Sequence, residues 1–139
     1  MKHWKKILFI VVLAFILTGL LYALYIWNKP ARDVSEEKGV QITAVAIFDS
    51  FTNNEQAANK LFLNKAIEVT GKVTSVQKNQ QGQTVVILQS DDPIYGVNCT
   101  FKQDPGTIDN NSIITFKGIC TGYLGDESDV IINEGILVK

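Results

Sequence analysis

The amino-acid sequence predicts a mainly β domain, a small barrel or sandwich of five strands preceded by two short helices, carried on one N-terminal transmembrane helix. Three observations support this prediction. Residues Ile7–Trp27 form a long apolar run with no charged side chain. After Asn64 the spacing of apolar residues changes from about 3.6 to about 2. The chain has 139 residues, of which 19% are charged, which is room for one ordered domain of common size.

The run Ile7–Trp27 is long enough to cross a bilayer. As an α-helix it would rise about 31 Å, close to the roughly 30 Å thickness of the hydrocarbon layer. A lone segment in hydrocarbon must be helical, because every backbone N–H and C=O needs an internal partner there. Aromatic residues, which favour the membrane interface, stand near both ends: Trp4, Tyr22, Tyr25 and Trp27.

Basic residues predict the orientation of this helix. Residues 1–6 contain three lysines, so we expect this segment in the cytoplasm and the chain after Trp27 outside the membrane. The alternative is a cleaved signal peptide, although the apolar run exceeds the roughly 7–15 residues usual for one and no A-x-A pattern follows it. We therefore predict a single-pass anchor in the cell membrane, with the lipid bilayer as its first partner and an extracytoplasmic C-terminal domain.

Residues 28–39 are polar and predict a linker between the membrane and a domain over residues 40–139. Thr43 is a suitable N-cap for a first helix over Ala44–Phe51, and a second helix is expected from about Asn54 to Phe62. The predicted buried faces contain Val45, Ile47, Phe48 and Phe51 in the first helix and Ala57, Ala58, Leu61 and Phe62 in the second.

Five segments after Asn64 alternate between apolar and polar residues or are rich in β-branched residues, which predicts strands. Their expected extents are about 67–74, Thr84–Gln89, 97–102, 114–120 and Val130–Val138. Gly71 lies within the first strand and suits a sharp bend, where a side chain would be crowded. Closing the strands into a barrel would remove exposed edges, but periodicity alone leaves the strand order open.

Several motifs in this domain resemble those of one known family. They are Asn54-Glu55, Ala58-Asn59, Phe62 and Asn64-Lys65 in the helical part, the strand Ile67–Val73, and the later segments Gly96–Phe101 and Lys117–Tyr123. Together they resemble the tRNA-anticodon-like OB-fold family of bacterial envelope proteins, over about residues 40–139. The resemblance implies a five-stranded barrel of the OB type with helices packed before its first strand. It implies no function.

Cys99 and Cys120 are the two cysteines of the chain, and both fall on the expected inward side of their strands. An oxidising compartment outside the membrane would allow a disulfide between them. Such a bond would contribute roughly 3 kcal/mol by restricting the unfolded chain, if its geometry is unstrained. The alternative is a pair of buried free thiols that act as small hydrophobic residues. We predict the disulfide and keep the alternative open.

The sequence contains no recognisable catalytic constellation. His3 is the single histidine and precedes the apolar run, so the external domain lacks the usual general base and imidazole metal ligand. Carboxylates cluster at Asp91-Asp92 and at Asp126-Glu127 with Asp129, but both clusters lie in predicted loops with too few oxygen ligands for a calcium site. We therefore predict no enzymatic activity, no cofactor and no metal site.

An OB barrel that binds a ligand uses the outward face of its second and third strands together with adjoining loops. In this sequence we expect the binding residues to be Lys72, Thr74, Tyr95, Asn98, Thr100, Lys102 and Tyr123. Residues 80–83 and 123–129 would form the loops beside that face. The two tyrosines would be able to stack on a base or on a sugar ring.

The net charge of the domain distinguishes between the candidate functions. From Val40 onward 11 acidic residues stand against 7 basic ones, without the basic track on which sequence-independent nucleic-acid binding depends. We therefore predict a non-catalytic binding or interaction module, with an envelope protein or a small envelope ligand as its partner. The alternative is binding of single-stranded nucleic acid or oligosaccharide through the OB face. A positive groove across that face would favour the nucleic acid.

Overall fold

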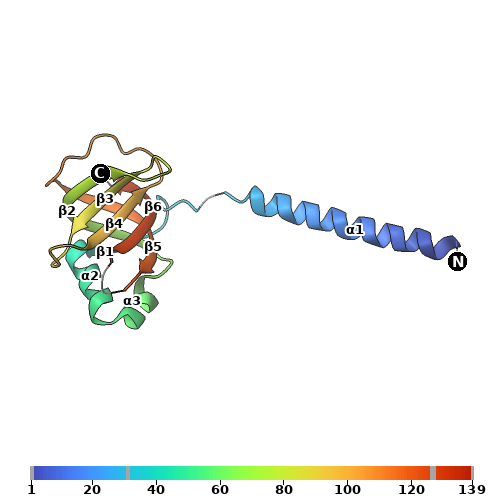
Figure 1. The fold of residues 1–139 in the computed structure, drawn as a ribbon, viewed down its shortest axis with the longest axis horizontal. Coiled ribbons are helices and arrows are strands. Elements are labelled where there is room, and N and C mark those ends of the chain that lie inside the picture. The colour runs from blue at the N-terminus through green and yellow to red at the C-terminus, as the bar shows by residue number, and fades with distance from the viewer. Residues whose placement is uncertain (1, 31, 126–127, 139) are drawn as a thin grey trace. The chain divides into compact units, whose positions relative to one another are not determined.

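The computed structural model describes residues 2–30, 32–125 and 128–138, and it divides the chain into two compact units, Met1–Arg32 and Asp33–Lys139. The first unit contains helix α1 (Lys2–Trp27). The second unit contains two short helices and the strands of a barrel (Figure 1).

Helix α1 has 26 residues and is about 39 Å long. The Thr18 hydroxyl donates to the Ala14 carbonyl oxygen at 2.7 Å, so this polar side chain is bonded to the helix itself. Apolar side chains are exposed all around the helix, and His3–Trp27 has the length and composition of a membrane-crossing segment. A signal sequence near an N-terminus shares these properties, so both expectations for this helix stand.

Helix α2 (Ala44–Asn53) begins at the predicted cap, and helix α3 (Glu55–Phe62) follows it after one residue. The Thr43 hydroxyl accepts the Ala46 N–H at 3.2 Å. The Asn54 carboxamide oxygen accepts the Ala57 N–H at 3.0 Å. Each side chain thereby satisfies a backbone donor that a helix leaves free at its start.

The buried faces of the two helices match the prediction in part. The buried residues of α2 are Ala44, Ile47, Phe48 and Phe51, so Ala44 takes the place expected for Val45. In α3, Ala58 and Phe62 are buried, whereas Ala57 and Leu61 are exposed and the prediction for them is wrong. A helix of two turns meets the barrel with a single i, i+4 row, which is narrower than the stripe of a longer helix.

Strand β1 (Val40–Thr43) precedes α2, and the sequence pattern does not indicate it. It pairs in parallel with the start of β2 (Ala66–Lys78), with Val40 opposite Ile67 and Thr43 opposite Thr70. Four residues are too few to establish a period of two. The strand forms because β2 offers it a free edge.

The barrel unit begins at Asp33, inside the stretch 28–39 that the sequence predicts as a linker. Val34 is 1% exposed, and the Lys117 ammonium donates to the Ser35 carbonyl oxygen at 3.3 Å. The Asp33 carboxylate accepts the Ser35 N–H at 2.9 Å and closes a turn around the buried valine. The last part of this stretch therefore lies against the barrel.

Five strands close into a barrel, as the sequence predicts (Figure 1). Around it β2 is followed by β3 (Thr84–Gln89), β4 (Gly96–Phe101), β6 (Val130–Val138) and β5 (Ile113–Tyr123), and β5 pairs back with β2. β4 and β6 run parallel, and the other neighbours within the barrel run antiparallel. The periodicity of the sequence does not predict this strand order.

The interior of the barrel follows the predicted alternation. On β4, Val97, Cys99 and Phe101 point inward and are each at most 1% exposed. Gly71 on β2 lies where an added Cβ would come within 2.8 Å of the Ala44 Cβ, which confirms the crowding predicted at this glycine. Helix α2 can pack against β2 only because this position has no side chain.

Candidate binding face of the barrel

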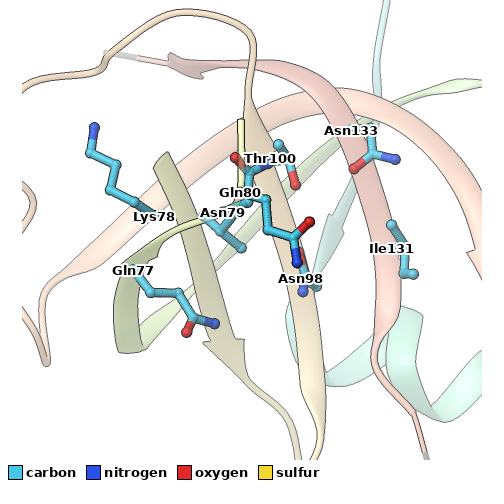
Figure 2. A pocket seen from close by; sticks show the side chains of 9 residues that line it. Gln77, Lys78, Asn79, Gln80, Asn98, Thr100, Ile131 and Asn133 are labelled. Atoms are coloured by element: carbon cyan, nitrogen blue, oxygen red, sulfur yellow. The ribbon is translucent and has the colours of Figure 1, made fainter. Parts of the chain in front are cut away.

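An open concavity of about 470 Å³ lies on the outward face of the barrel, over β3, β4 and β6 and beside the turn between β2 and β3 (Figure 2). The residues that line it are Gln77, Lys78, Asn79, Gln80, Val85, Asn98, Thr100, Ile131 and Asn133. OB barrels that bind ligands use this part of their surface.

The strand register brings the lining residues together. Val85 on β3 stands opposite Thr100 on β4, and Asn98 on β4 stands opposite Ile131 on β6. Residues two apart on a strand face the same side, so Asn133 joins Ile131 on this face. The result is an aliphatic floor of Val85 and Ile131 with polar side chains around it.

Asn79 shapes the turn that borders the concavity. Its side-chain oxygen accepts the Gln81 N–H at 3.0 Å and the Gln83 N–H at 2.9 Å, and its amide donates to the Gln83 side chain at 3.0 Å. Gly82 has a φ of 78°, which glycine adopts without strain. The turn holds the exposed Gln80 at the edge of the concavity.

Polar side chains on this face differ in whether they form hydrogen bonds to other protein groups. Within the described part of the chain, Gln77, Gln80, Asn98 and Thr100 have side chains that make no hydrogen bond to the protein. Asn133 differs, because its amide donates to a threonine hydroxyl of β5 at 3.3 Å. The first four side chains are therefore available to a ligand.

Lys78 is the single charged residue among those that line the concavity. Its ammonium lies 3.5 Å from the Asp104 carboxylate, and in Figure 2 its side chain points away from Asn98 and Thr100. The Gly106 N–H, followed by the Lys78 charge, holds the pKa of Asp104 below its usual value, so this carboxylate is ionised at neutral pH. The lysine charge is thereby offset, and the face is close to neutral.

Asn98 and Thr100, two of the seven predicted binding residues, line the concavity. Lys102 follows them just beyond the end of β4 and does not line it. Lys72 borders a separate cleft of about 200 Å³, beside the start of α2 and the end of β3. The Thr74 hydroxyl donates to a carbonyl oxygen of β3 at 3.1 Å. The structure therefore does not gather the predicted set into one site.

The two tyrosines lie away from the concavity, and the stacking role predicted for Tyr123 is wrong. Its side chain is 7% exposed, and the centre of its ring lies 6.3 Å from that of Phe48 and 5.8 Å from that of Phe51. Helix α2 covers the ring, which completes the core instead of meeting a ligand. Tyr95 is partly buried and packs against the same core.

Six residues that line the concavity are missing from the prediction: Gln77, Lys78, Asn79, Val85, Ile131 and Asn133. Gln77 could have been found, because β2 continues to Lys78, beyond its predicted end. The two residues of β6 could not, because they reach this face only through the parallel pairing of β6 with β4. No local pattern reports a pairing between strands so far apart in the chain.

Two carboxylates of the loop clusters, Asp92 and Asp129, accept hydrogen bonds from backbone N–H groups. Asp92 accepts the Tyr95 N–H at 2.9 Å and the Ile94 N–H at 2.7 Å, and these bonds hold the pKa of its carboxyl below the usual value. Asp129 accepts a backbone N–H at the start of β4 at 2.8 Å. Asp126-Glu127 lies outside the described residues. Among the residues that are described, no three His, Cys, Asp or Glu side chains are grouped closely enough to hold a metal ion.

The predicted disulfide between Cys99 and Cys120 is wrong, because both thiols are free and buried. Each cysteine pairs with Ile132, Cys99 from β4 and Cys120 from β5. Strand β6 therefore separates them, and two inter-strand spacings put their Cα atoms about 10 Å apart, beyond the roughly 7 Å that a disulfide spans. Burial raises the pKa of both thiols, which makes them unreactive hydrophobic residues of the core.

Comparison with known proteins agrees with this architecture. The sequence model of the tRNA_anti-like family matches residues 1–136. This chain belongs to the tRNA_anti-like family. The resemblance found in its motifs is therefore confirmed, and its barrel is the OB-type barrel that the resemblance implies. No curated protein matches this tRNA_anti-like chain.

One similar solved structure is that of a Klebsiella pneumoniae subsp. pneumoniae protein, provisionally named a nucleic acid-binding lipoprotein. The two chains superimpose with a TM-score of 0.54 and share 20% sequence identity. The match covers 80% of this tRNA_anti-like chain and 100% of the Klebsiella chain. At this identity the likeness concerns the fold alone.

Proposed function

We propose that this tRNA_anti-like protein is a membrane-anchored, non-catalytic binding module whose extracytoplasmic barrel holds an uncharged polar ligand in the concavity. The composition of the concavity carries this proposal. Carboxamide and hydroxyl groups surround an aliphatic floor, and the single ammonium lies 3.5 Å from a carboxylate. Such a surface offers both donors and acceptors of hydrogen bonds while carrying little net charge.

The chemistry of these side chains favours binding over catalysis. Carboxamides and hydroxyls without a neighbouring base supply neither a general base nor an activated nucleophile. Cys99 and Cys120 lie on the inward side of the sheet, and burial keeps them as neutral thiols at neutral pH. The concavity is therefore suited to hold a ligand without transforming it.

Single-stranded nucleic acid is the alternative ligand, and the name of the similar Klebsiella protein favours it. Grooves that bind such strands combine several cations with aromatic side chains on which bases stack. The described lining of this concavity contains Lys78, which is paired with Asp104, and no aromatic residue. An uncharged ligand fits this surface better.

The apolar helix supports the anchored location, and the lysines before it support a cytoplasmic N-terminus. Cell fractionation combined with a C-terminal reporter fusion tests both. We expect the full-length chain in the membrane fraction, with the reporter active outside the cytoplasm. A soluble product that lacks residues 1–30, or a reporter active in the cytoplasm, would contradict the proposed location.

Photo-crosslinking in cells tests the ligand site. The substitution Gln80→p-benzoylphenylalanine places a photoreactive group at the edge of the concavity. It is expected to form an adduct with an envelope component, and nuclease treatment should leave this adduct intact. The matched control is Gln56→p-benzoylphenylalanine at an exposed position of α3, which should form no adduct. Equal labelling at both positions, or an adduct that nuclease removes, would overturn the proposal.

A further inference from the structure

We propose that the concavity binds the main chain of an extended polypeptide segment, with little dependence on the side chains of that segment. This inference rests on the proposed function, since it names the ligand class of the same site. It assigns the recognition to the carboxamide groups of Asn98, Gln77 and Gln80, supported by the Thr100 hydroxyl.

A carboxamide has the same hydrogen-bonding groups as a peptide unit. The side chain of Asn or Gln can accept a peptide N–H through its oxygen and donate to a peptide C=O through its amide at the same time. Asn98, Gln77 and Gln80 line the concavity, and the fold as described leaves their carboxamides without hydrogen bonds to protein groups. An extended segment placed there would have backbone donors and acceptors satisfied by these side chains.

The spacing of the polar groups matches that of an extended chain. Asn98 and Thr100 are two residues apart on β4, so their outward side chains are about 6.7 Å apart. The N–H and C=O groups on one side of an extended peptide repeat at the same distance. Alternate residues of the ligand can therefore present their backbone groups to Asn98 and Thr100 in register, while Val85 and Ile131 offer an aliphatic surface to side chains of the ligand.

Other ligand classes fit these contacts less well. A nucleic-acid strand carries a negative charge at every phosphate, and the Lys78 ammonium is already 3.5 Å from the Asp104 carboxylate. Bases bind against aromatic faces, as sugar rings often do, and Tyr123 lies away from the concavity, 7% exposed within the core. A peptide main chain needs neither a cation nor an aromatic face.

Peptide binding to the full chain in lipid nanodiscs tests this inference by isothermal titration calorimetry. The probes are blocked decapeptides, acetylated and amidated, of several unrelated uncharged sequences. We expect similar dissociation constants for all of them, because the contacts are made to the main chain. Raising the salt concentration should leave the affinity unchanged, because no charged groups are brought together.

Two protein variants and one modified peptide separate main-chain recognition from general adhesion. Asn98→Ala is expected to weaken binding about tenfold, as the loss of its hydrogen bonds to the ligand predicts. Gln56→Ala removes an exposed carboxamide from α3 and should leave the affinity unchanged. Peptides with N-methyl groups at alternate residues keep their side chains but lose backbone donors, so they should bind at least about tenfold more weakly.

Several other outcomes of these experiments would contradict the inference. Equal affinity for methylated and unmethylated peptides, or no peptide binding, would overturn it. Binding of chitohexaose that Asn98→Ala abolishes, without peptide binding, would overturn the inference but leave the proposed function standing. Tight binding of a thymidine decanucleotide that weakens steeply with salt would overturn both.

Discussion

Strand β4 has an apolar side and a polar side, because apolar and polar residues alternate along this short segment. Val97, Cys99 and Phe101 point into the barrel and are at most 1% exposed. Asn98 and Thr100 point into the concavity and make no side-chain hydrogen bond to the described part of the protein. Stability and the proposed binding therefore depend on alternate residues of one strand, which allows the outward set to change without disturbing the inward set.

Space also differs between the two sides. Inside the barrel, the Phe116 ring lies edge-on to Phe101 with 4.9 Å between ring centres. An added Cβ at Gly135 would collide with the Phe116 ring, so the interior is filled. Outside, the concavity leaves about 470 Å³ open to solvent. Substitutions on the two sides should therefore have effects of different kinds.

The largest expected effect is on the inward side. Phe116→Ala removes a fully buried ring and leaves a cavity between Phe101 and Gly135. We expect the free energy of unfolding to fall by about 3–5 kcal/mol. Chemical denaturation followed by circular dichroism measures this loss. A change below about 1 kcal/mol would contradict the tight packing described for the barrel interior.

A smaller loss is expected where helix α2 meets the barrel. Gly71→Ala would place a Cβ within 2.8 Å of the Ala44 Cβ and 3.2 Å of the Leu88 Cβ. Neither neighbour is the end of a flexible side chain, so we expect a destabilisation of about 1–3 kcal/mol in the same denaturation experiment. Gly106→Ala is the control for adding a methyl group without a steric clash, because open space surrounds that glycine. Its positive φ of 84° predicts a modest loss from backbone strain alone.

The loop that leads into β4 should respond to pH. Backbone N–H groups of Tyr95 and Ile94 hold the pKa of Asp92 below its usual value in the folded protein. A lowered folded-state pKa adds stability above the unfolded value of about 3.9, and this stability is lost as the pH falls through the folded value. Melting temperatures measured from neutral pH down to about 3 should therefore fall less steeply for Asp92→Asn than for the wild type.

The adjacent carboxylate offers a matched control for this pH experiment. Asp91 is exposed and accepts none of the loop hydrogen bonds made by Asp92. Asp91→Asn should therefore retain the pH dependence of the wild-type protein. Identical curves for Asp91→Asn and Asp92→Asn would contradict the role given to the Asp92 hydrogen bonds.

The smallest expected effect on stability is on the outward side of β4. Asn98→Ala removes a side chain that makes no hydrogen bond to the described protein, so unfolding free energy should change by less than about 0.5 kcal/mol. Because this variant is also expected to lose peptide affinity, it separates binding from stability at one residue. A large destabilisation would show that Asn98 supports the fold, and the contrast between the two sides of β4 would fail.

Much of the fold could be predicted because its signals are local. The strands Thr84–Gln89 and Val130–Val138 have the predicted bounds, since their content of β-branched residues is a local signal. Thr43 begins α2 as predicted, since a cap depends on its own helix. β1 could not be predicted, because its four residues form a strand only beside β2.

The candidate site could be predicted only where it lies on one strand. Asn98 and Thr100 follow from alternation along β4. Ile131 and Asn133 enter the site because β6 joins β4 in parallel, a pairing between segments separated by a whole strand and two loops. Tyr123 was assigned to the binding face because its loop borders that face in an OB barrel, whereas the packing of α2 places it in the core.

By itself the sequence determined the apolar N-terminal helix, the short helices, the five barrel strands and, where apolar and polar residues alternate, the side of a strand that is buried. Only the tertiary structure decided that β6 separates Cys99 from Cys120, that Tyr123 belongs to the core, and that β2, β3, β4 and β6 share one polar concavity. The reason is physical. Burial and capping act between residues close in the chain, whereas barrel closure selects among strand pairings that have the same local pattern.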